Sequence, residues 1–215
     1  MNDLSEASKV LSAFRSGSLK MAVSKIETRL VGIGQLQAGR ELDALGVNID
    51  LMLAALLIKK HSNQISEIIH AVGILLVLPK ILEPDEFVES LSLAAGNTGK
   101  GFDLETNRRV AEFTFIEWQG GSESIRQNKV FKDFYFLAEH STTKRRELYV
   151  AGLDHPMRFF NSGRNIAQIA KNNRKLGDAA VNLPPEVKTV RDYYFPRRHI
   201  VSIRDLGEYL TVLRG

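Results

Sequence analysis

The chain has 215 residues, of which 44% are hydrophobic and 25% charged, and Lys and Arg outnumber Asp and Glu by 29 to 25. This composition is typical of a packed globular protein and excludes a disordered one. The absence of cysteine excludes disulfides, thiol nucleophiles and iron–sulfur clusters, and it favours a reducing compartment. The basic excess permits a polyanionic partner without demanding one.

We expect a cytoplasmic protein with no membrane partner. The N-terminus carries no signal-peptide pattern, and the longest apolar runs, 51–58 and 71–78, are too short to span a bilayer. Apolar residues at three- and four-residue spacing predict helices over 5–14, 19–30, 41–45 and 49–60. We expect another helix over 62–78, with Ser62 or Asn63 as its cap and Pro79 at its end. We therefore divide the chain into a helical N-terminal section, 1–61, and a core, 62–215.

The pattern changes after Pro84, where alternating residues predict strands. We expect strands over 87–93, 101–106 and 109–119, then a helix over 123–139, a strand over 147–152 and a helix over 165–175. A strand over 200–203 and a helix over 205–213 close the chain. This order predicts an α/β core behind a helical section.

The segment 101–119 holds the residues that point to chemistry. A tight turn at 107–108 would pair Thr106 with Arg109 and Asp103 with Glu112. Opposed residues on antiparallel strands share a face with Cβ atoms ~5 Å apart, and two such carboxylates repel each other. A divalent cation relieves that repulsion, and Mg²⁺ and Mn²⁺ prefer hard oxygen ligands. A metal there can polarise a phosphoryl oxygen.

At these residues the chain resembles the PD-(D/E)XK nuclease superfamily, the restriction-endonuclease-like proteins. That family has an acid on one central strand and an acid-x-Lys triplet on the next, within the order helix, three strands, helix, strand, helix. Asp103 in GFDLET matches the first acid, and Glu112 in VAEFTF matches the second. The resemblance covers about 62–175. It implies a mixed sheet flanked by helices, and Mg²⁺ (or Mn²⁺) held by Asp103 and Glu112.

The triplet departs from the family at its third position, where Thr114 stands in place of lysine. Four explanations remain open. In the first, the acid-x-Lys triplet corresponds to Glu117-Trp118-Gln119, although strand parity places Glu117 and Asp103 on opposite faces. In the second, a lysine from the following helix takes the missing place, with Lys129 and Lys132 as candidates. In the third the protein is catalytically silent, and in the fourth its sequence has been altered at this position.

Two further residues have weaker resemblances to the family. Gln127, followed by Phe131, resembles a Gln-x-x-x-Tyr element of recombination-type nucleases, with Phe in place of Tyr. Glu67 precedes the first strand on a helix where the family often has another metal-binding acid. The resemblance thus implies a catalytic set of Asp103, Glu112, Thr114 (at the lysine position), Gln127 and Lys132, and a metal set of Asp103, Glu112 and Glu67.

Plainer interpretations stand beside these. Asp103 and Glu112 are also consistent with the polar outer face of a hairpin, where their carboxylates form surface ion pairs with Arg108 and Arg109. The phenylalanines are consistent with a hydrophobic core. The loop 96–101 lacks the spacing of a phosphate-binding P-loop, and the histidines lack zinc-hydrolase spacing.

The resemblance implies metal-dependent hydrolysis of nucleic-acid phosphodiesters, preferably DNA. The alternative is a catalytically silent protein on the same scaffold that binds nucleic acid or a protein partner. In a third interpretation, the helical section makes the chain an interaction module with incidental carboxylates. Residues 1–61 leave three roles open: formation of a homodimer, coverage of the site, or contact with substrate.

Overall fold

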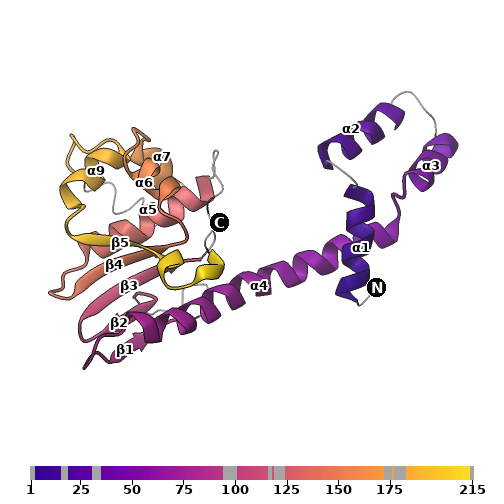
Figure 1. The fold of residues 1–215 in the computed structure, drawn as a ribbon. Coiled ribbons are helices and arrows are strands. Elements are labelled where there is room, and N and C mark those ends of the chain that lie inside the picture. Colours follow the sequence, from indigo (N-terminus) through magenta and orange to yellow (C-terminus); the bar gives the residue numbers. More distant parts are fainter. Residues whose placement is uncertain are drawn as a thin grey trace. The chain divides into compact units, whose positions relative to one another are not determined.

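The computed structural model describes residues 3–15, 19–30, 35–93, 101–115, 118, 124–171, 176 and 183–213. The chain forms two compact units, Met1–Ser66 and Glu67–Gly215 (Figure 1). The division that we expected between 61 and 62 falls inside helix α4 (Ile49–Ile81), which contributes to both units.

The first unit is helical. It contains α1 (Leu4–Arg15), α2 (Leu19–Leu30), α3 (Gln35–Ala44) and the first part of α4. Gly46 takes a left-handed φ of 69° between α3 and α4, and the Asn48 side chain then caps α4 by accepting a 3.0 Å hydrogen bond from the Leu51 amide. Among the described side chains of this unit, only Ala7 and Ala54 are buried apolar residues.

Helix α4 joins two segments that we expected to be separate helices. It runs over 33 residues, so Ser62 lies in its interior and Pro79 lies in its last turn instead of ending it. A proline this close to the C-terminus removes one backbone donor, and the Leu82 amide still bonds to the Leu78 carbonyl at 3.1 Å. We expected no apolar segment long enough to span a bilayer. By length and composition, however, α4 is long and apolar enough to do so. A core helix passes the same test, and Ile74, Val77 and Ile81 are buried against the sheet.

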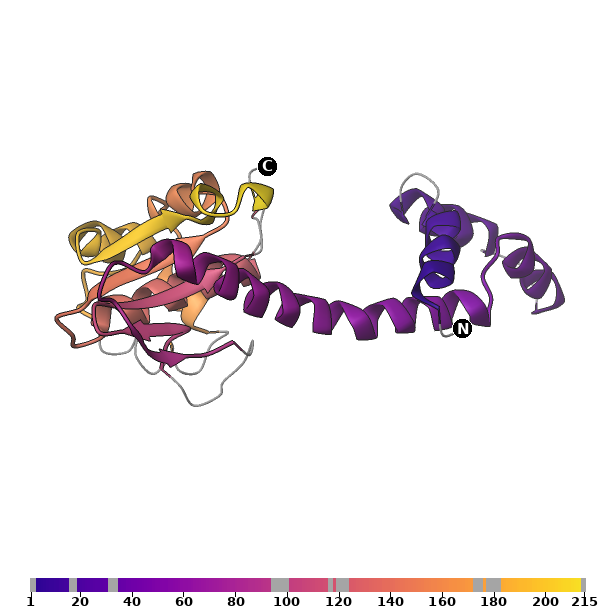
Figure 2. The ribbon, with the colours of Figure 1, turned by 60° about the horizontal axis from the view of Figure 1, so that its bottom comes forward.

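The second unit contains a five-stranded mixed sheet in the order β1-β2-β3-β4-β5. The strands are β1 (Val88–Leu91), β2 (Leu104–Thr106), β3 (Arg109–Thr114), β4 (Arg145–Val150) and β5 (Val201–Asp205). The first three strands are antiparallel neighbours, whereas β3, β4 and β5 pair in parallel. The C-terminal part of α4 covers one face of this sheet and the remaining helices cover the other (Figures 1 and 2). The unit therefore has the α/β architecture that the element order predicted.

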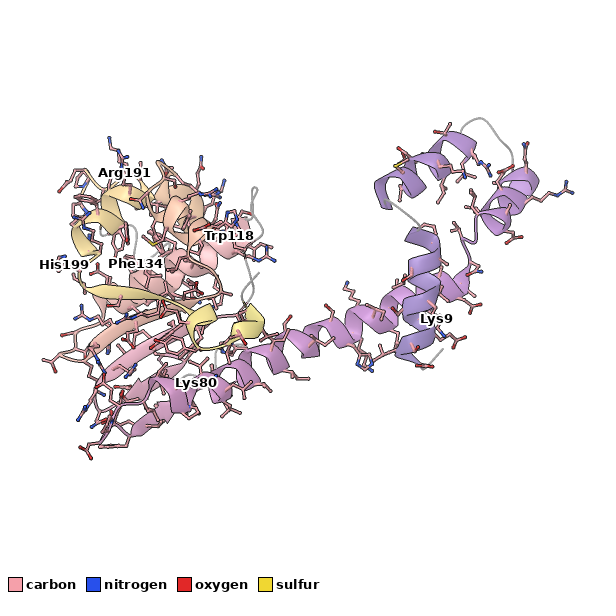
Figure 3. All side chains as sticks on the ribbon, viewed as in Figure 1. Lys9, Lys80, Trp118, Phe134, Arg191 and His199 are labelled. Atoms are coloured by element: carbon pink, nitrogen blue, oxygen red, sulfur yellow. The ribbon has the colours of Figure 1, made fainter. Side chains whose placement is uncertain are left out.

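Alternation along β3 decides which layer each of its side chains meets. Ala111 and Phe113 pack towards α4, whereas Val110 packs towards α5 (Ser124–Glu139), in the core that includes Phe134 (Figure 3). Because successive side chains of a strand point to opposite faces, Glu112 and Thr114 share the α5 side with Val110.

Helices α6 (Asp154–Phe160), α7 (Ile166–Ala170) and α9 (Val190–Arg197) complete the α5 layer. We did not expect α6 or α9 from the sequence. Helix α9 has a capping box in which the Thr189 hydroxyl and the Asp192 carboxylate each accept a backbone N–H. The closing helix expected over 205–213 is wrong, since two short 3₁₀ turns, η1 (Leu206–Glu208) and η2 (Thr211–Leu213), stand there instead.

Arg109 is buried on the α4 side of the sheet and is not a surface residue. Its Nε lies 2.6 Å from Glu86 Oε1, and its Nη1 lies 2.8 Å from Glu147 Oε2. Its Nη2 donates to the Ile81 carbonyl at the end of α4 at 2.7 Å. This guanidinium therefore connects α4, the segment before β1, and strands β3 and β4.

Candidate active site

Asp103 and Glu112 face each other across the β2–β3 hairpin. The strands pair Leu104 with Ala111 and Glu105 with Val110, and the same register continued by one residue opposes Asp103 and Glu112. The Thr106 hydroxyl fixes the turn by accepting hydrogen bonds from the amides of Arg108 and Arg109 at 3.0 and 2.8 Å. The two carboxyl groups are joined by a side-chain hydrogen bond.

The two carboxyl groups ionise very differently. Burial, reinforced by the negative charges of Asp133 and Asp103, raises the pKa of Glu112 to about 10. Burial also opposes ionisation of Asp103, but hydrogen bonds from His70 and from the Phe113 amide outweigh it and lower the pKa of that carboxyl. Near neutral pH the pair therefore holds one proton, with Glu112 as the donor to Asp103.

His70 approaches the pair from α4. Its Nε2 lies 3.3 Å from Asp103 Oδ1, while the Phe113 amide donates to Asp103 Oδ2 at 2.9 Å. The imidazole also meets the Phe115 ring edge to face, with centroids 6.1 Å apart. Both oxygens of Asp103 are thus held by partners on neighbouring elements.

Lys129 of α5 occupies the place where the triplet has no lysine of its own. Its Nζ donates to Thr114 Oγ1 at 3.1 Å and to the Phe113 carbonyl at 3.4 Å. The same ammonium lies 2.6 Å from Asp133 Oδ2, one helical turn further along α5. Although 44% of the Lys129 side chain is exposed, its ammonium interacts electrostatically with Asp133, Glu112 and Asp103, and these outweigh desolvation to raise its pKa.

The other residues that we singled out lie in different surroundings. Lys132 Nζ is 3.5 Å from Asp133 Oδ1, and no contact joins it to Thr114 in the described structure, so of the two candidate lysines Lys129 is the one that contacts Thr114. Gln127 accepts a hydrogen bond from the Arg164 guanidinium. At 100° per residue, Gln127 and Lys129 lie on opposite flanks of α5, which separates Gln127 from Thr114. Phe131 is fully buried in the core.

Glu67 is exposed on α4, one turn before His70. No described contact joins Glu67 to Asp103, and His70 makes that contact from the same helix. Glu117 and Gln119 lie outside the described residues, whereas Trp118 between them is buried.

Sequence reasoning missed two contributors to the site, His70 and Asp133. For Asp133 a signal existed, because the Lys129–Asp133 spacing of four residues places the two side chains on one face of a helix. For His70 the sequence offers no comparable signal, since only the packing of α4 on the sheet brings it to Asp103.

Several basic side chains of this unit form ion pairs with carboxylates. Arg108, Lys144 and Arg145 pair with carboxylates of Glu83, Glu89 and Glu105, and Arg197 pairs with Glu139. Within the described ranges, Arg158 and Arg164 have no carboxylate partner; Arg158 is exposed, whereas the Arg164 guanidinium donates to Gln127. Residues 174–175 lie outside those ranges.

The donor set suits a hard divalent cation bound with the help of substrate. In the described part of the chain, no group of three or more His, Asp or Glu side chains is arranged as a metal site. Two carboxylates, with waters and substrate phosphate oxygens completing the shell, are nevertheless how Mg²⁺ is often held. The proton shared by Asp103 and Glu112 marks the place where a cation would compete for the same oxygens.

No protein-family model, no curated protein and no solved structure matches this chain. The geometry of the site is therefore the basis for any function proposed for this chain.

Proposed function

We propose that the chain is a metal-dependent nuclease that hydrolyses phosphodiester bonds, with DNA as the expected substrate. One observation carries the proposal: two opposed carboxyl groups on adjacent strands lie beside an ammonium held on the next helix. The order α4, β1, β2, β3, α5, β4 supports a PD-(D/E)XK-like core, because it repeats the helix, three strands, helix and strand of that family.

Each residue has a distinct role in this proposal. Asp103 and Glu112 would hold Mg²⁺ or Mn²⁺, and the bound cation would polarise the phosphoryl group and assist ionisation of the attacking water. His70 orients the Asp103 carboxylate through its 3.3 Å contact. Lys129 supplies the positive charge that Thr114 lacks, and so stabilises negative charge that develops on the phosphoryl oxygens.

Arg158 and Arg164 supply charge for the nucleic-acid backbone. A backbone contact of this kind weakens steeply as salt rises, because binding releases counterions. We therefore expect the affinity for DNA to fall with added salt, and to fall less steeply in an Arg158→Gln, Arg164→Gln variant.

The direct test is cleavage of plasmid and linear DNA in Mg²⁺ or Mn²⁺. We expect cleavage by the parent protein and none by an Asp103→Asn, Glu112→Gln double variant, which preserves shape and removes both acids. Glu105→Gln is the matched control, since Glu105 lies on the same strand but pairs with Lys144 at 2.8 Å. Cleavage that persists in the double variant would refute this assignment of the acids.

A silent scaffold that binds nucleic acid or a protein partner is the second candidate, and Thr114 is the residue that favours it. Titration of the parent and the double variant with Mn²⁺ separates the two functions. A nuclease binds Mn²⁺ through Asp103 and Glu112, whereas a silent scaffold has no need of a hard-cation site. Absence of both cleavage and Mn²⁺ binding would leave the silent scaffold.

A further inference from the structure

Asp133 is an unusually buried carboxylate for a helix that borders an active site. Only 1% of its side chain is exposed, and its oxygens lie 2.6 Å from Lys129 Nζ and 3.5 Å from Lys132 Nζ. Burial of a carboxylate is costly unless charged partners compensate it. Both of these charged partners come from α5 itself.

The Lys129 ammonium has three donors, and three oxygens surround it: Asp133 Oδ2 at 2.6 Å, Thr114 Oγ1 at 3.1 Å and the Phe113 carbonyl at 3.4 Å. Lysine is a point charge on a flexible stem, and it needs such contacts to remain in one place. The shortest of the three contacts is the one to Asp133. Without it, Lys129 would keep only two longer bonds to uncharged oxygens.

We propose that Asp133 is a positioning residue that holds the Lys129 ammonium against Thr114 at the candidate active site. The pair on α5 thereby replaces a lysine that the strand triplet lacks. This inference rests on the proposed nuclease function, but the contact between Asp133 and Lys129 can be tested without it.

The first test measures how fast an acylating reagent modifies Lys129 in the full chain, by peptide mass spectrometry. In Asp133→Asn we expect Lys129 to react several-fold faster than in the parent, because its ammonium has lost its charged partner. Lys80, which donates to the Tyr209 carbonyl at 2.5 Å in another part of the unit, is the internal reference (Figure 3). An unchanged rate at Lys129 overturns the proposal.

The second test compares kcat and KM for DNA cleavage in two backgrounds. In the parent, Asp133→Asn should lower kcat about tenfold or more with little change in KM, as expected for a displaced catalytic charge. In Thr114→Lys, Lys129→Met the lysine comes from the strand, and there Asp133→Asn should change kcat less than about twofold. An equal loss in both backgrounds would show a merely structural role and overturn the proposal.

Glu139→Gln is the matched control on the same helix, because Glu139 pairs with Arg197 at 3.0 Å. It should alter neither Lys129 reactivity nor kcat. If Asp133→Asn fails to fold, Asp133→Ser serves the same comparisons, since it also removes the charge and adds no bulk. If the parent cleaves no DNA, the nuclease proposal fails, and the acylation rates alone decide whether Asp133 holds Lys129.

Discussion

Glu112 is a carboxyl group whose surroundings favour its neutral form. Burial and the neighbouring Asp133 and Asp103 raise its pKa to about 10, and its proton bonds to Asp103. Without metal, a neutral amide of the same shape can therefore replace it with little structural cost. With metal, the same amide provides no negative charge for the cation.

We accordingly expect Glu112→Gln to separate stability from activity. The free energy of unfolding at neutral pH should be at least as high as in the parent, because the variant no longer has to keep a buried acid protonated. If the chain is the proposed nuclease, the cleavage rate should fall at least ~100-fold, because one of the two carboxylates proposed to bind the cation is gone. Urea unfolding without metal and cleavage in Mg²⁺ measure the two effects. A clear loss of stability would contradict a neutral Glu112 in the folded protein.

Glu86 has the opposite behaviour, and its charge contributes to stability. Burial opposes its ionisation, but hydrogen bonds from Arg109 and Thr106 prevail and lower its pKa to about 2. Between that value and the unfolded value of 4.5, the unfolded chain binds more protons than the folded one. The stability that Glu86 contributes is therefore present above pH 4.5 and is lost as the pH falls towards 2.

Glu86→Gln should remove the part of the pH dependence of stability that comes from Glu86. At pH 6 the variant should be about 3 kcal/mol less stable than the parent, because part of the Arg109 charge is left uncompensated in a buried position. The difference should shrink as the pH is lowered below 4.5, and urea midpoints at pH 6, 4 and 3 measure it. Glu186→Gln is the control, since this carboxylate is exposed and makes no hydrogen bond or ion pair among the described residues. A difference that stays constant with pH would contradict the ionised Glu86.

At the level of elements, the sequence predicted those whose signals are local. The turn at 107–108 and the alternation of β3 set the opposition of Asp103 and Glu112, and the structure has that register. Long-range packing determined what the sequence did not predict. Only the packing of α5 against β3 determines that Lys129, and not Lys132, contacts Thr114. Only the packing of α4 on the sheet brings His70 to Asp103. The helix α4 itself was predicted as two pieces, because its middle is polar.

Gly73 allows α4 to lie close to the sheet. A Cβ at this position would be 2.4 Å from the Phe115 ring, closer than any real contact allows. Gly73→Ala should therefore push α4 away from Phe115, destabilise the unit by about 2 kcal/mol and weaken the contact between His70 and Asp103. Gly163→Ala, where nothing lies within 4 Å, should change stability by less than about 0.5 kcal/mol. Urea unfolding and the cleavage rate measure both variants, and equal stability of the two would contradict the tight approach.

At the level of the whole molecule, the two units differ in how much apolar surface they bury. The second unit has a core on each face of its sheet, whereas Ala7 and Ala54 are the buried apolar residues among the described side chains of the first. Every residue that we assign to the site, from His70 to Asp133, belongs to Glu67–Gly215. The larger buried core and the candidate site therefore lie in the same unit.

The single tryptophan makes this division measurable, because Trp118 is 7% exposed and belongs to the core that α5 covers. Its fluorescence reports on the second unit alone. We expect a fragment of residues 67–215 to unfold in urea with the same fluorescence midpoint as the full chain, since the core around Trp118 is complete within it. The fragment should also keep metal-dependent cleavage of DNA. A midpoint lowered in the fragment, with activity lost, would show instead that residues 1–66 support the site.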